Sequence, residues 1–402
     1  MKHKFVLFSL LFLLVGCNVL PSEELSTSTV PTSSESSEQS SATASEISSA
    51  VSSEITSILP SEPVSEGERT GKRNLHFFGL NDFHGAVTES GSDPGIFRIS
   101  SYIKHLENIY DGNVIKLNAG DYWQGSADSN LNNGQFLNDV LTALDFDAFT
   151  LGNHEFDWFD TTIEQNRGLT NVPYLGANIM RKATDAVATN LVSYDDTFKG
   201  SIIVNKNDVN IGIIGVMGEG LESSILATAI APYYFASVDT YVRSEAANLR
   251  ALGADMIVLT THDSLAEYPG YTNLGNYTGI INEKIVDIVF SGHYHLQHNA
   301  VENGIPILQT NGYGRQVMEV SGAYNFDTKE FEVTDSGLTF ASTLKTYAED
   351  VSILNLFEPY RTAAEPIKNE VVGTLTATMS TTQLATLAHR VMYDLVKDNY
   401  LA

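Results

Sequence analysis

Short apolar runs, each followed by an acidic, amide or imidazole side chain, recur along the chain and limit its fold most strongly. Seven runs have the length and β-branched content of strands, and they cover residues 74–82, 113–121, 146–153, 209–218, 254–263, 286–295 and 305–314. Segments with apolar residues at helical spacing lie between several of them, at 96–110, 134–146 and 240–253. This alternation predicts an α/β domain rather than an all-β sandwich.

The polar residues at the strand ends predict one shared site. In an α/β sheet the carboxyl ends of the strands converge on one crevice, so side chains that follow them meet there. The residues at these ends are Asp82, His84, Asp121, Asn153, His154, Asp157, His262, His293 and His295. A lone histidine after a strand is more often a surface or capping residue, and Gly-Asp alone is usually a turn. The prediction depends on five such ends occurring in one domain.

The residue types at these ends suit a metal centre. Carboxylates and neutral imidazoles bind Zn, Mn, Fe or Co, and without cysteine in this region the site is not a structural zinc knot. Asp82 and His84, like His293 and His295, are one residue apart, which puts both side chains on one face of an extended segment. A carboxylate shared by two ions would hold them about 3.5–4 Å apart, the arrangement used for attack on phosphorus.

The order of motifs resembles that of the calcineurin-like metallophosphatases. It is most similar to the secreted 5′-nucleotidases and the UDP-sugar or cyclic-nucleotide hydrolases. The resemblance covers about residues 73–345 and rests on the motifs NDFHG, GDYWQGS, LGNHEFDW, YLGANI, SGHYHLQ and QTNGYGRQV. It implies an α/β fold, the four-layer αββα sandwich, over residues 73–348. Residues 349–402 would then be a linker helix and only the truncated start of the family's second domain.

The resemblance also implies a role for each strand-end residue. The metal ligands it implies are Asp82, His84 and His295 for a first ion, Asn153, His262 and His293 for a second, and Asp121 between them. The ions would be two divalent metals, Zn, Mn, Fe, Co or Mg, that activate a hydroxide as the nucleophile. His154 and Asp157 match the catalytic dyad, in which His154 assists the leaving oxygen and Asp157 orients its imidazole. Glu155 is expected to point elsewhere.

The activity that the resemblance implies is hydrolysis of phosphate esters of extracellular nucleotides, of the 5′-nucleotidase type. Two alternatives stay open. One is a phosphodiesterase or pyrophosphohydrolase that uses the same site on cyclic nucleotides, UDP-sugars or dinucleotides. The other is a non-catalytic surface lipoprotein that binds nucleotides, metal or a host partner. The metal ligands do not separate these readings, and neither the base-recognition residues nor the oligomeric state is predicted.

The first twenty residues, MKHKFVLFSLLFLLVGCNVL, read as a targeting segment. Lys2 and Lys4 precede a short apolar stretch, and its end, LVGC, resembles the lipobox of bacterial lipoproteins. The expectation is a signal peptide over residues 1–17 with lipid attached to Cys17, the only cysteine; the alternative is an ordinary signal peptide. Residues 18–72, rich in Ser and Glu, predict a disordered tether. The protein would sit on the outer face of a bacterial membrane, held there by its lipid anchor.

The charge of the chain excludes one class of partner. There are 23 Lys and Arg residues against 49 Asp and Glu residues, which gives a formal net charge of −26. So acidic a protein repels nucleic-acid phosphates, and no basic, aromatic-interleaved patch offsets that repulsion. The expected partner is a nucleotide or another small phosphate ester, and not a nucleic-acid polymer.

Overall fold

The structure is a computed structural model that describes residues 69–193, 200–268, 271–371 and 378–400. The expected signal peptide, Cys17 and nearly all of the tether lie outside the described residues. Thr70–Ala402 belong to one compact unit.

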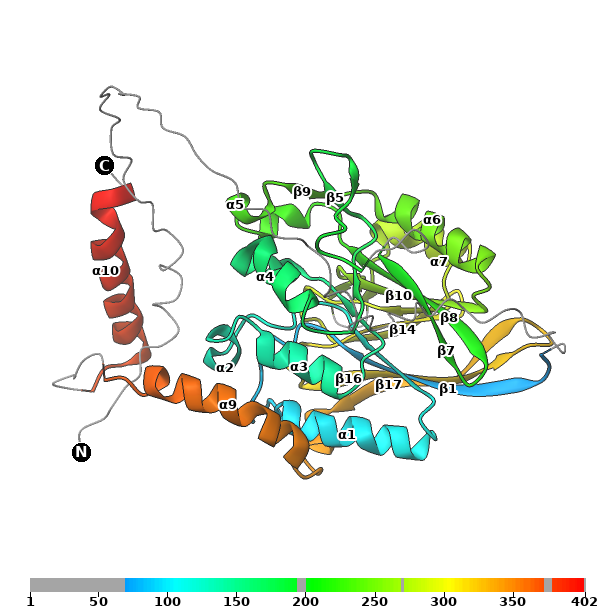
Figure 1. Cartoon of the computed structure of the whole chain (residues 1–402), viewed down its shortest axis with the longest axis horizontal. Coiled ribbons are helices and arrows are strands. Elements are labelled where there is room, and N and C mark those ends of the chain that lie inside the picture. The colour runs from blue at the N-terminus through cyan, green and yellow to red at the C-terminus, as the bar shows by residue number, and fades with distance from the viewer. Residues whose placement is uncertain (1–68, 194–199, 269–270, 372–377, 401–402) are drawn as a thin grey trace, which may run out of the picture. The chain divides into compact units, whose positions relative to one another are not determined.

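Two six-stranded mixed sheets form the centre of this unit (Figure 1). The strands of the first sheet, in spatial order, are β17 (Glu330–Phe340), β16 (Gln316–Asn325), β1 (Lys72–Leu80), β2 (Val114–Asn118), β3 (Ala148–Thr150) and β4 (Tyr174–Leu175). From β1 to β4 the strands are parallel, whereas β16 runs antiparallel to both of its neighbours. The hairpin of β16 and β17 therefore extends this sheet beyond β1.

The second sheet has the same size and also mixes strand directions. Its strands, in spatial order, are β14 (His298–Glu302), β15 (Ile305–Gln309), β13 (Ile288–Phe290), β10 (Met256–His262), β8 (Val209–Met217) and β7 (Ser201–Lys206). The four central strands are parallel, and the two edge strands are antiparallel to their neighbours. All seven strands predicted from the sequence are present, as β1, β2, β3, β8, β10, β13 and β15.

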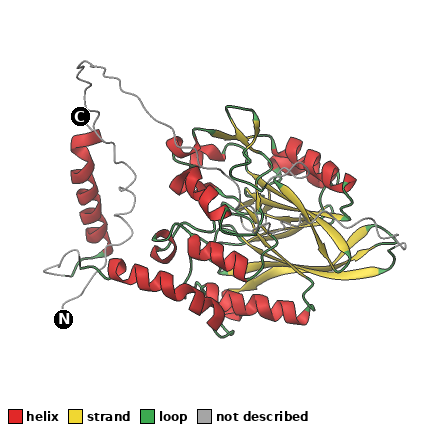
Figure 2. Cartoon of the chain, in the orientation of Figure 1, coloured by secondary structure: helices red, strands yellow, loops and turns green. Residues whose placement is uncertain are grey.

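Helices cover the outer faces of the two sheets, which gives four layers (Figure 2). Helices α1 (Ile96–Ile109), α3 (Gln135–Ala143) and α9 (Val351–Lys368) bury apolar side chains with those of the first sheet. Helices α6 (Val238–Ala251) and α7 (Thr278–Asn282) do the same with the second sheet. A third core fills the space between the sheets, with Phe77 from one and Phe290 from the other. The predicted α/β class and its layered sandwich are confirmed.

Shorter elements connect these layers. The remaining helices are α2 (Ala127–Asn130), α4 (Phe159–Arg167), α5 (Ala227–Ile230), α8 (Ala341–Leu344), α10 (Thr381–Tyr400) and the 3₁₀ segments η2 (Asn153–Trp158), η3 (Leu221–Ser224) and η4 (Gly275–Tyr277). The remaining strands are β5 (Ile179–Arg181), β6 (Ala186–Val187), β9 (Tyr233–Phe235), β11 (Ala266–Tyr268) and β12 (Tyr271–Thr272). Among the helices described, none combines the length and apolarity needed to cross a bilayer.

Candidate metal centre and active site

The strand-end residues singled out from the sequence come from both sheets. Three segments of the first sheet supply Asp82 after β1, Asp121 after β2 and Asn153 after β3. The second sheet supplies His262 at the last position of β10, and His293 and His295 after β13. The candidate site therefore lies where the carboxyl ends of parallel strands from two sheets meet.

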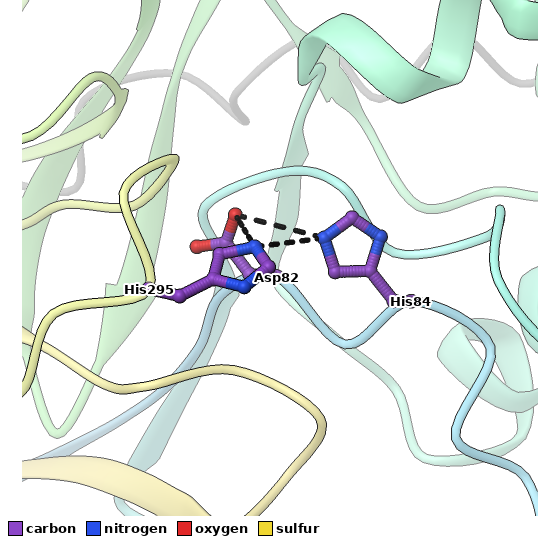
Figure 3. A group of neighbouring side chains, drawn as sticks. All are labelled: Asp82, His84 and His295. Atoms are coloured by element: carbon purple, nitrogen blue, oxygen red, sulfur yellow. Dashed lines mark hydrogen bonds and ion pairs between the residues drawn. The ribbon is translucent and has the colours of Figure 1, made fainter. Parts of the chain in front are cut away.

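Asp82, His84 and His295 form the first cluster (Figure 3). The Nε2 atoms of His84 and His295 are 2.9 Å apart, and Asp82 Oδ1 lies 3.3 Å from His295 Nε2 and 4.0 Å from His84 Nε2. Asp82 is fully buried and His84 is 7% exposed. Three ligand-type atoms that converge on one point are what a bound divalent cation requires.

Asp121 links this cluster to a second one. Its Oδ2 atom lies 3.8 Å from His84 Nε2 and 3.1 Å from His262 Nε2. His293 completes the second cluster with Asp121 and His262. Asn153 also belongs there, because its Oδ1 atom is 3.0 Å from both His262 Nε2 and His293 Nδ1. The donor set thus fits two cations that share one carboxylate.

Backbone contacts orient two of the imidazoles. His84 Nδ1 donates to the carbonyl of Gln124 at 3.0 Å, and His262 Nδ1 donates to the carbonyl of Ala119 at 2.8 Å. Each bond leaves Nε2 as the ring atom that faces the cluster, so the tautomer is the one that a metal ligand needs.

The charge balance around the clusters favours cation binding. Burial lowers the pKa of His84, and the charges of Asp121 and Asp82 offset this only in part, so the ring is neutral. Burial and the nearby His262 lower the pKa of His293 to about 4. For His262, burial would lower the pKa, but the charge and hydrogen bond of Asp121 raise it. Without a cation, His262 and Asp121 therefore form a buried ion pair whose proton a metal would displace.

The backbone at the ligands is unusual. Five of the strand-end residues have left-handed φ angles, namely Asp82 (49°), His84 (49°), Asp121 (54°), His293 (78°) and His295 (51°). Few non-glycine residues adopt this region, although Asp and His do so more often than most. Close packing reinforces the loop geometry, because a Cβ on Gly152 would lie 2.3 Å from Asp121 Oδ1. Only glycine therefore fits at position 152.

His154 and Asp157 form a pair at the edge of the clusters. His154 Nδ1 lies 2.7 Å from Asp157 Oδ2, and the backbone N–H of His154 donates to Asp121 Oδ1 at 2.8 Å. Burial would lower the pKa of His154, but the hydrogen bond to Asp157 and the charge of Asp121 raise it to about 9. The imidazole is therefore protonated at neutral pH and available as an acid.

The Glu155 side chain points away from the candidate metal ligands' side chains, as expected from the sequence, and contacts the backbone of the loops that carry them. The side chain is fully buried. Its two oxygens accept four backbone N–H groups, from Gly152 (2.7 Å), Asp121 (2.9 Å), Tyr122 (2.9 Å) and Trp123 (3.3 Å). One carboxylate thus joins the loop after β2 to the loop after β3. The signal that could have revealed it was an acidic residue inside an otherwise ligand-rich stretch.

Tyr313 was also missed by the sequence analysis. Its ring centroid lies 5.4 Å from that of His84 and 5.5 Å from that of His295. The guanidinium carbon of Arg315 lies over the Tyr313 ring, 4.6 Å from the ring centroid. The ring therefore packs beside both imidazoles of the first cluster.

A cavity of about 720 Å³ opens over the clusters. His84, Asp121, Asn153, His154, His293 and His295 line one side of it. Pockets of this size accommodate a small-molecule ligand, so the clusters are accessible to a substrate larger than phosphate.

Two mixed sheets that meet at a shared cluster of Asp, Asn and His residues are the arrangement found in solved metallophosphoesterase structures. No protein-family model matches the chain. The similar solved structures include the calcineurin-like phosphoesterase YfkN from Bacillus subtilis, which has a TM-score of 0.62 at 16% identity; the match covers 74% of this chain and 100% of that one. This likeness concerns the fold.

Similar sequences extend the comparison. Endonuclease YhcR of Bacillus subtilis is 27% identical over 74% of this chain and 26% of its own length. Cell wall protein Lmo0130 of Listeria monocytogenes is 24% identical over 74% of this chain and 43% of its own length. Snake venom 5′-nucleotidase of Crotalus adamanteus is 25% identical over 66% of this chain and 48% of its own length. The chain therefore spans less than half the length of each of these relatives.

By its homologues and structural neighbours, the chain is similar to the calcineurin-like metallophosphoesterases and to the N-terminal domain of the 5′-nucleotidase family. Enzymes of this group are hydrolases of phosphate esters, as the names of these 5′-nucleotidase and apyrase relatives indicate.

Proposed function

We propose that the protein hydrolyses phosphate esters of nucleotides, in the manner of a 5′-nucleotidase, with two divalent metal ions. The observation that carries the proposal is Asp121, whose carboxylate lies between the His84 and His262 imidazoles. Such a shared carboxylate suits two adjacent cations, of Zn, Mn, Fe, Co or Mg. Bound there, they would activate water and neutralise the charge that develops on the phosphate oxygens.

The remaining roles follow from the geometry of the side chains. Asp82, His84 and His295 would hold one cation, and Asn153, His262 and His293 the other. His154, protonated at neutral pH, would donate its proton to the leaving oxygen as the P–O ester bond breaks. Asp157, bonded to Nδ1, would hold the imidazole so that Nε2 faces that oxygen. The products are inorganic phosphate and an alcohol.

A second candidate is hydrolysis of phosphodiesters or pyrophosphates, such as cyclic nucleotides, UDP-sugars or dinucleotides, at the same site. The similarity to a protein named as an endonuclease favours it. The net charge of −26 opposes a polymeric nucleic acid as the substrate, so the diester would be a small molecule.

The test uses the purified full-length chain, stripped of metal and then resupplied with Mn²⁺ or Zn²⁺. Phosphate release is followed from AMP, from an aryl phosphate, and from UDP-glucose with added phosphatase. Metal-dependent release from AMP that is lost in Asp121→Asn supports the nucleotidase, and a higher rate on UDP-glucose supports the second candidate. Metal binding without turnover of any substrate overturns both and favours a binding lipoprotein.

We also propose that lipid on Cys17 anchors the protein to the outer face of a bacterial membrane. The LVGC sequence supports this, as does similarity to a protein named as a cell wall protein. Labelling cells with radioactive palmitate tests it, with Cys17→Ala as the control. Absence of label from the wild-type chain, or equal label in both chains, contradicts the anchor.

A further inference from the structure

A second cavity, of about 180 Å³, shares no described lining residue with the cavity over the metal clusters. It is lined by His76 from β1 and by Glu319 and Ser321 from β16. The neighbours of His76 in β1, Leu75 and Phe77, belong to the core between the two sheets. Because side chains alternate along a strand, His76 points to the opposite face, so this cavity lies on the outer face of the first sheet.

Ser321, His76 and Glu319 lie in series in this cavity. His76 and Ser321 face each other across the antiparallel strands β1 and β16, and Ser321 Oγ lies 2.8 Å from His76 Nδ1. On the other side of the ring, His76 Nε2 lies 3.1 Å from Glu319 Oε2. An ionised carboxylate only accepts hydrogen bonds, so Nε2 carries the ring proton and Nδ1 is left to accept the proton of the serine. The order is that of a nucleophile, a base and a group that orients the base.

The surroundings hold this series in one arrangement. His76 is 1% exposed, and the ring of Tyr110 stacks on it at a centroid distance of 4.1 Å and an interplanar angle of 11°. Tyr102 donates its hydroxyl proton to Glu319 Oε1 at 2.6 Å, which leaves Oε2 for His76. Burial would raise the pKa of Glu319, but its hydrogen bonds, first that to His76, lower it, so the carboxylate is charged at neutral pH. The base is therefore held beside the serine without any rearrangement.

The cavity offers the serine both access and a hydrogen-bond donor. Ser321 is half-buried, and a register shift between Ser321 and Gly322 interrupts the pairing of β16 with β17 beside it. Bulges of this kind re-aim side chains next to functional sites. The hydroxyl of Tyr110 lies 3.3 Å from Ser321 Oγ. A carbonyl attacked by Ser321 can place its oxygen within reach of that hydroxyl, which is the position of an oxyanion donor.

Size and charge limit the ligand's chemistry. Glu319 and Asp335 bring two carboxylates to the cavity, and its described lining residues include no lysine or arginine. Both carboxylates would repel a phosphate ester, whereas an uncharged acyl ester meets no such repulsion. A volume of about 180 Å³ accommodates a short acyl group rather than a nucleotide.

We propose that Ser321 is the nucleophile of a second, metal-independent site that hydrolyses small, uncharged acyl esters, with His76 as the general base. Ser321 Oγ bonds to the acyl carbon while its proton passes to His76 Nδ1. The C–O ester bond then breaks, and His76 gives the proton to the leaving alcohol. Water attacks the acyl carbon with His76 again as the base, the proton passes to Ser321 Oγ, and the carboxylic acid leaves. Glu319 is a positioning residue, which acts through the His76 ring.

The experiment uses the full-length chain loaded with Mn²⁺, with p-nitrophenyl acetate as the uncharged ester and p-nitrophenyl phosphate as the substrate of the metal site. A fluorophosphonate probe traps the nucleophile, because Ser321 Oγ bonds to phosphorus as fluoride leaves, and mass spectrometry of peptides locates the label. The variants are Ser321→Ala, His76→Gln and Glu319→Gln. Ser336→Ala is the matched control, because Ser336 lies in the neighbouring strand β17 but does not line the cavity.

The label is expected on Ser321. Hydrolysis of the acetate ester is expected to fall about 100-fold or more in Ser321→Ala and His76→Gln, with no change in the control. Glu319→Gln is expected to lower kcat for this ester about ten-fold and to leave its KM unchanged, because Glu319 does not touch the substrate. Chelator should abolish phosphate release from the aryl phosphate but leave acetate hydrolysis and labelling unchanged.

Absence of label on Ser321, or acetate hydrolysis by Ser321→Ala at the wild-type rate, overturns the second site. Loss of acetate hydrolysis on chelation overturns it as well, because the metal centre then performs both reactions. Thermal unfolding identifies variants that fail to fold, and the labelled position and the chelator result then decide on the wild-type chain alone. Absence of metal-dependent phosphate release overturns the proposed nucleotidase and leaves the second site standing.

Discussion

The carboxylate of Glu155 accepts the backbone N–H of Asp121 at 2.9 Å while it also accepts that of Gly152 at 2.7 Å. These two donors belong to different strand-end loops, and each loop carries candidate metal ligands. The distance between Asp121 and Asn153 therefore depends on a side chain that is not itself a candidate ligand.

Glu155→Gln is expected to lower both stability and metal affinity. The amide keeps one acceptor oxygen but turns an NH₂ group toward buried N–H donors, which leaves some of them unsatisfied. The free energy of unfolding should fall by about 1–3 kcal/mol. Urea unfolding and metal titration measure the two effects. Glu330→Gln, at an exposed position of β17, is the control and should change neither. Wild-type metal affinity in Glu155→Gln would show that Glu155 does not hold the loops in register.

Asp157→Asn is expected to shift the pH dependence of turnover. The hydrogen bond that His154 donates to Asp157 is a main reason that the pKa of His154 is raised, to about 9, against the effect of burial. Removing that charge lowers the pKa, so the imidazole loses its proton at a lower pH. The alkaline limb of the kcat profile should therefore move to lower pH, with kcat at pH 8 reduced about ten-fold or more.

Profiles of kcat against pH from 6 to 10 on an aryl phosphate provide the measurement. Asp145→Asn is the control, because Asp145 is exposed and its left-handed backbone suits asparagine equally well. An alkaline limb that stays in place in Asp157→Asn argues against His154 as the acid.

Metal removal is expected to destabilise the protein, and more strongly at higher pH. A cation must displace the proton shared by the buried Asp121–His262 pair, so its affinity rises as the pH rises. At a metal concentration one hundred times the Kd, stabilisation should be about 2.7 kcal/mol. Thermal unfolding with chelator and with Mn²⁺, at pH 6 and pH 8, measures this. Asp121→Asn should lose most of the stabilisation, and an equal shift in both chains would exclude Asp121 as a ligand.

Glu319, which does not line the cavity over the metal clusters, is expected to contribute an acid-sensitive part of the stability. Burial would raise its pKa, but hydrogen bonds to His76, Thr339 and Tyr102 lower it below the usual value of 4.5. A carboxyl whose folded pKa is depressed stabilises the protein above its unfolded pKa and loses that contribution as the pH falls through the folded value. Glu319→Gln should therefore cost about 1–2 kcal/mol at pH 7 and little at pH 3.5.

Urea unfolding at pH 3.5, 5 and 7 tests this, with metal binding at pH 7 as the check that the site is intact. If the cost is the same at all three values, the carboxylate charge does not stabilise the fold.

The strands and their polar ends could be predicted because buried parallel strands are near-continuous apolar runs. The hydrophobic pattern did not show which strands pair with each other in the sheets. β1 lies beside β16, more than two hundred residues later in the chain, and periodicity carries no information on such long-range neighbours. The short strands β5, β6 and β9 were missed because two or three residues form no detectable period.

The candidate site divides in the same way. Histidine and aspartate residues after strands can be recognised in the sequence as candidate ligands by their residue type. The roles of Glu155 and Tyr313 depend on contacts that form only in the folded chain. The structural role of Glu155 was not predicted, because its partners are backbone N–H groups that no sequence motif displays.

The left-handed backbone at Asp82, His84, Asp121, His293 and His295 affects which mutations the fold can accept during evolution. Each such residue costs the folded chain on the order of 1 kcal/mol that glycine would not. A mutation to glycine at one of these positions removes a ligand and relieves conformational strain in the same step. Relatives no longer under selection for turnover can therefore lose the metal ligands while the protein still folds. Inactive relatives that keep the fold are therefore expected, and glycine at one or more of these five positions would identify them.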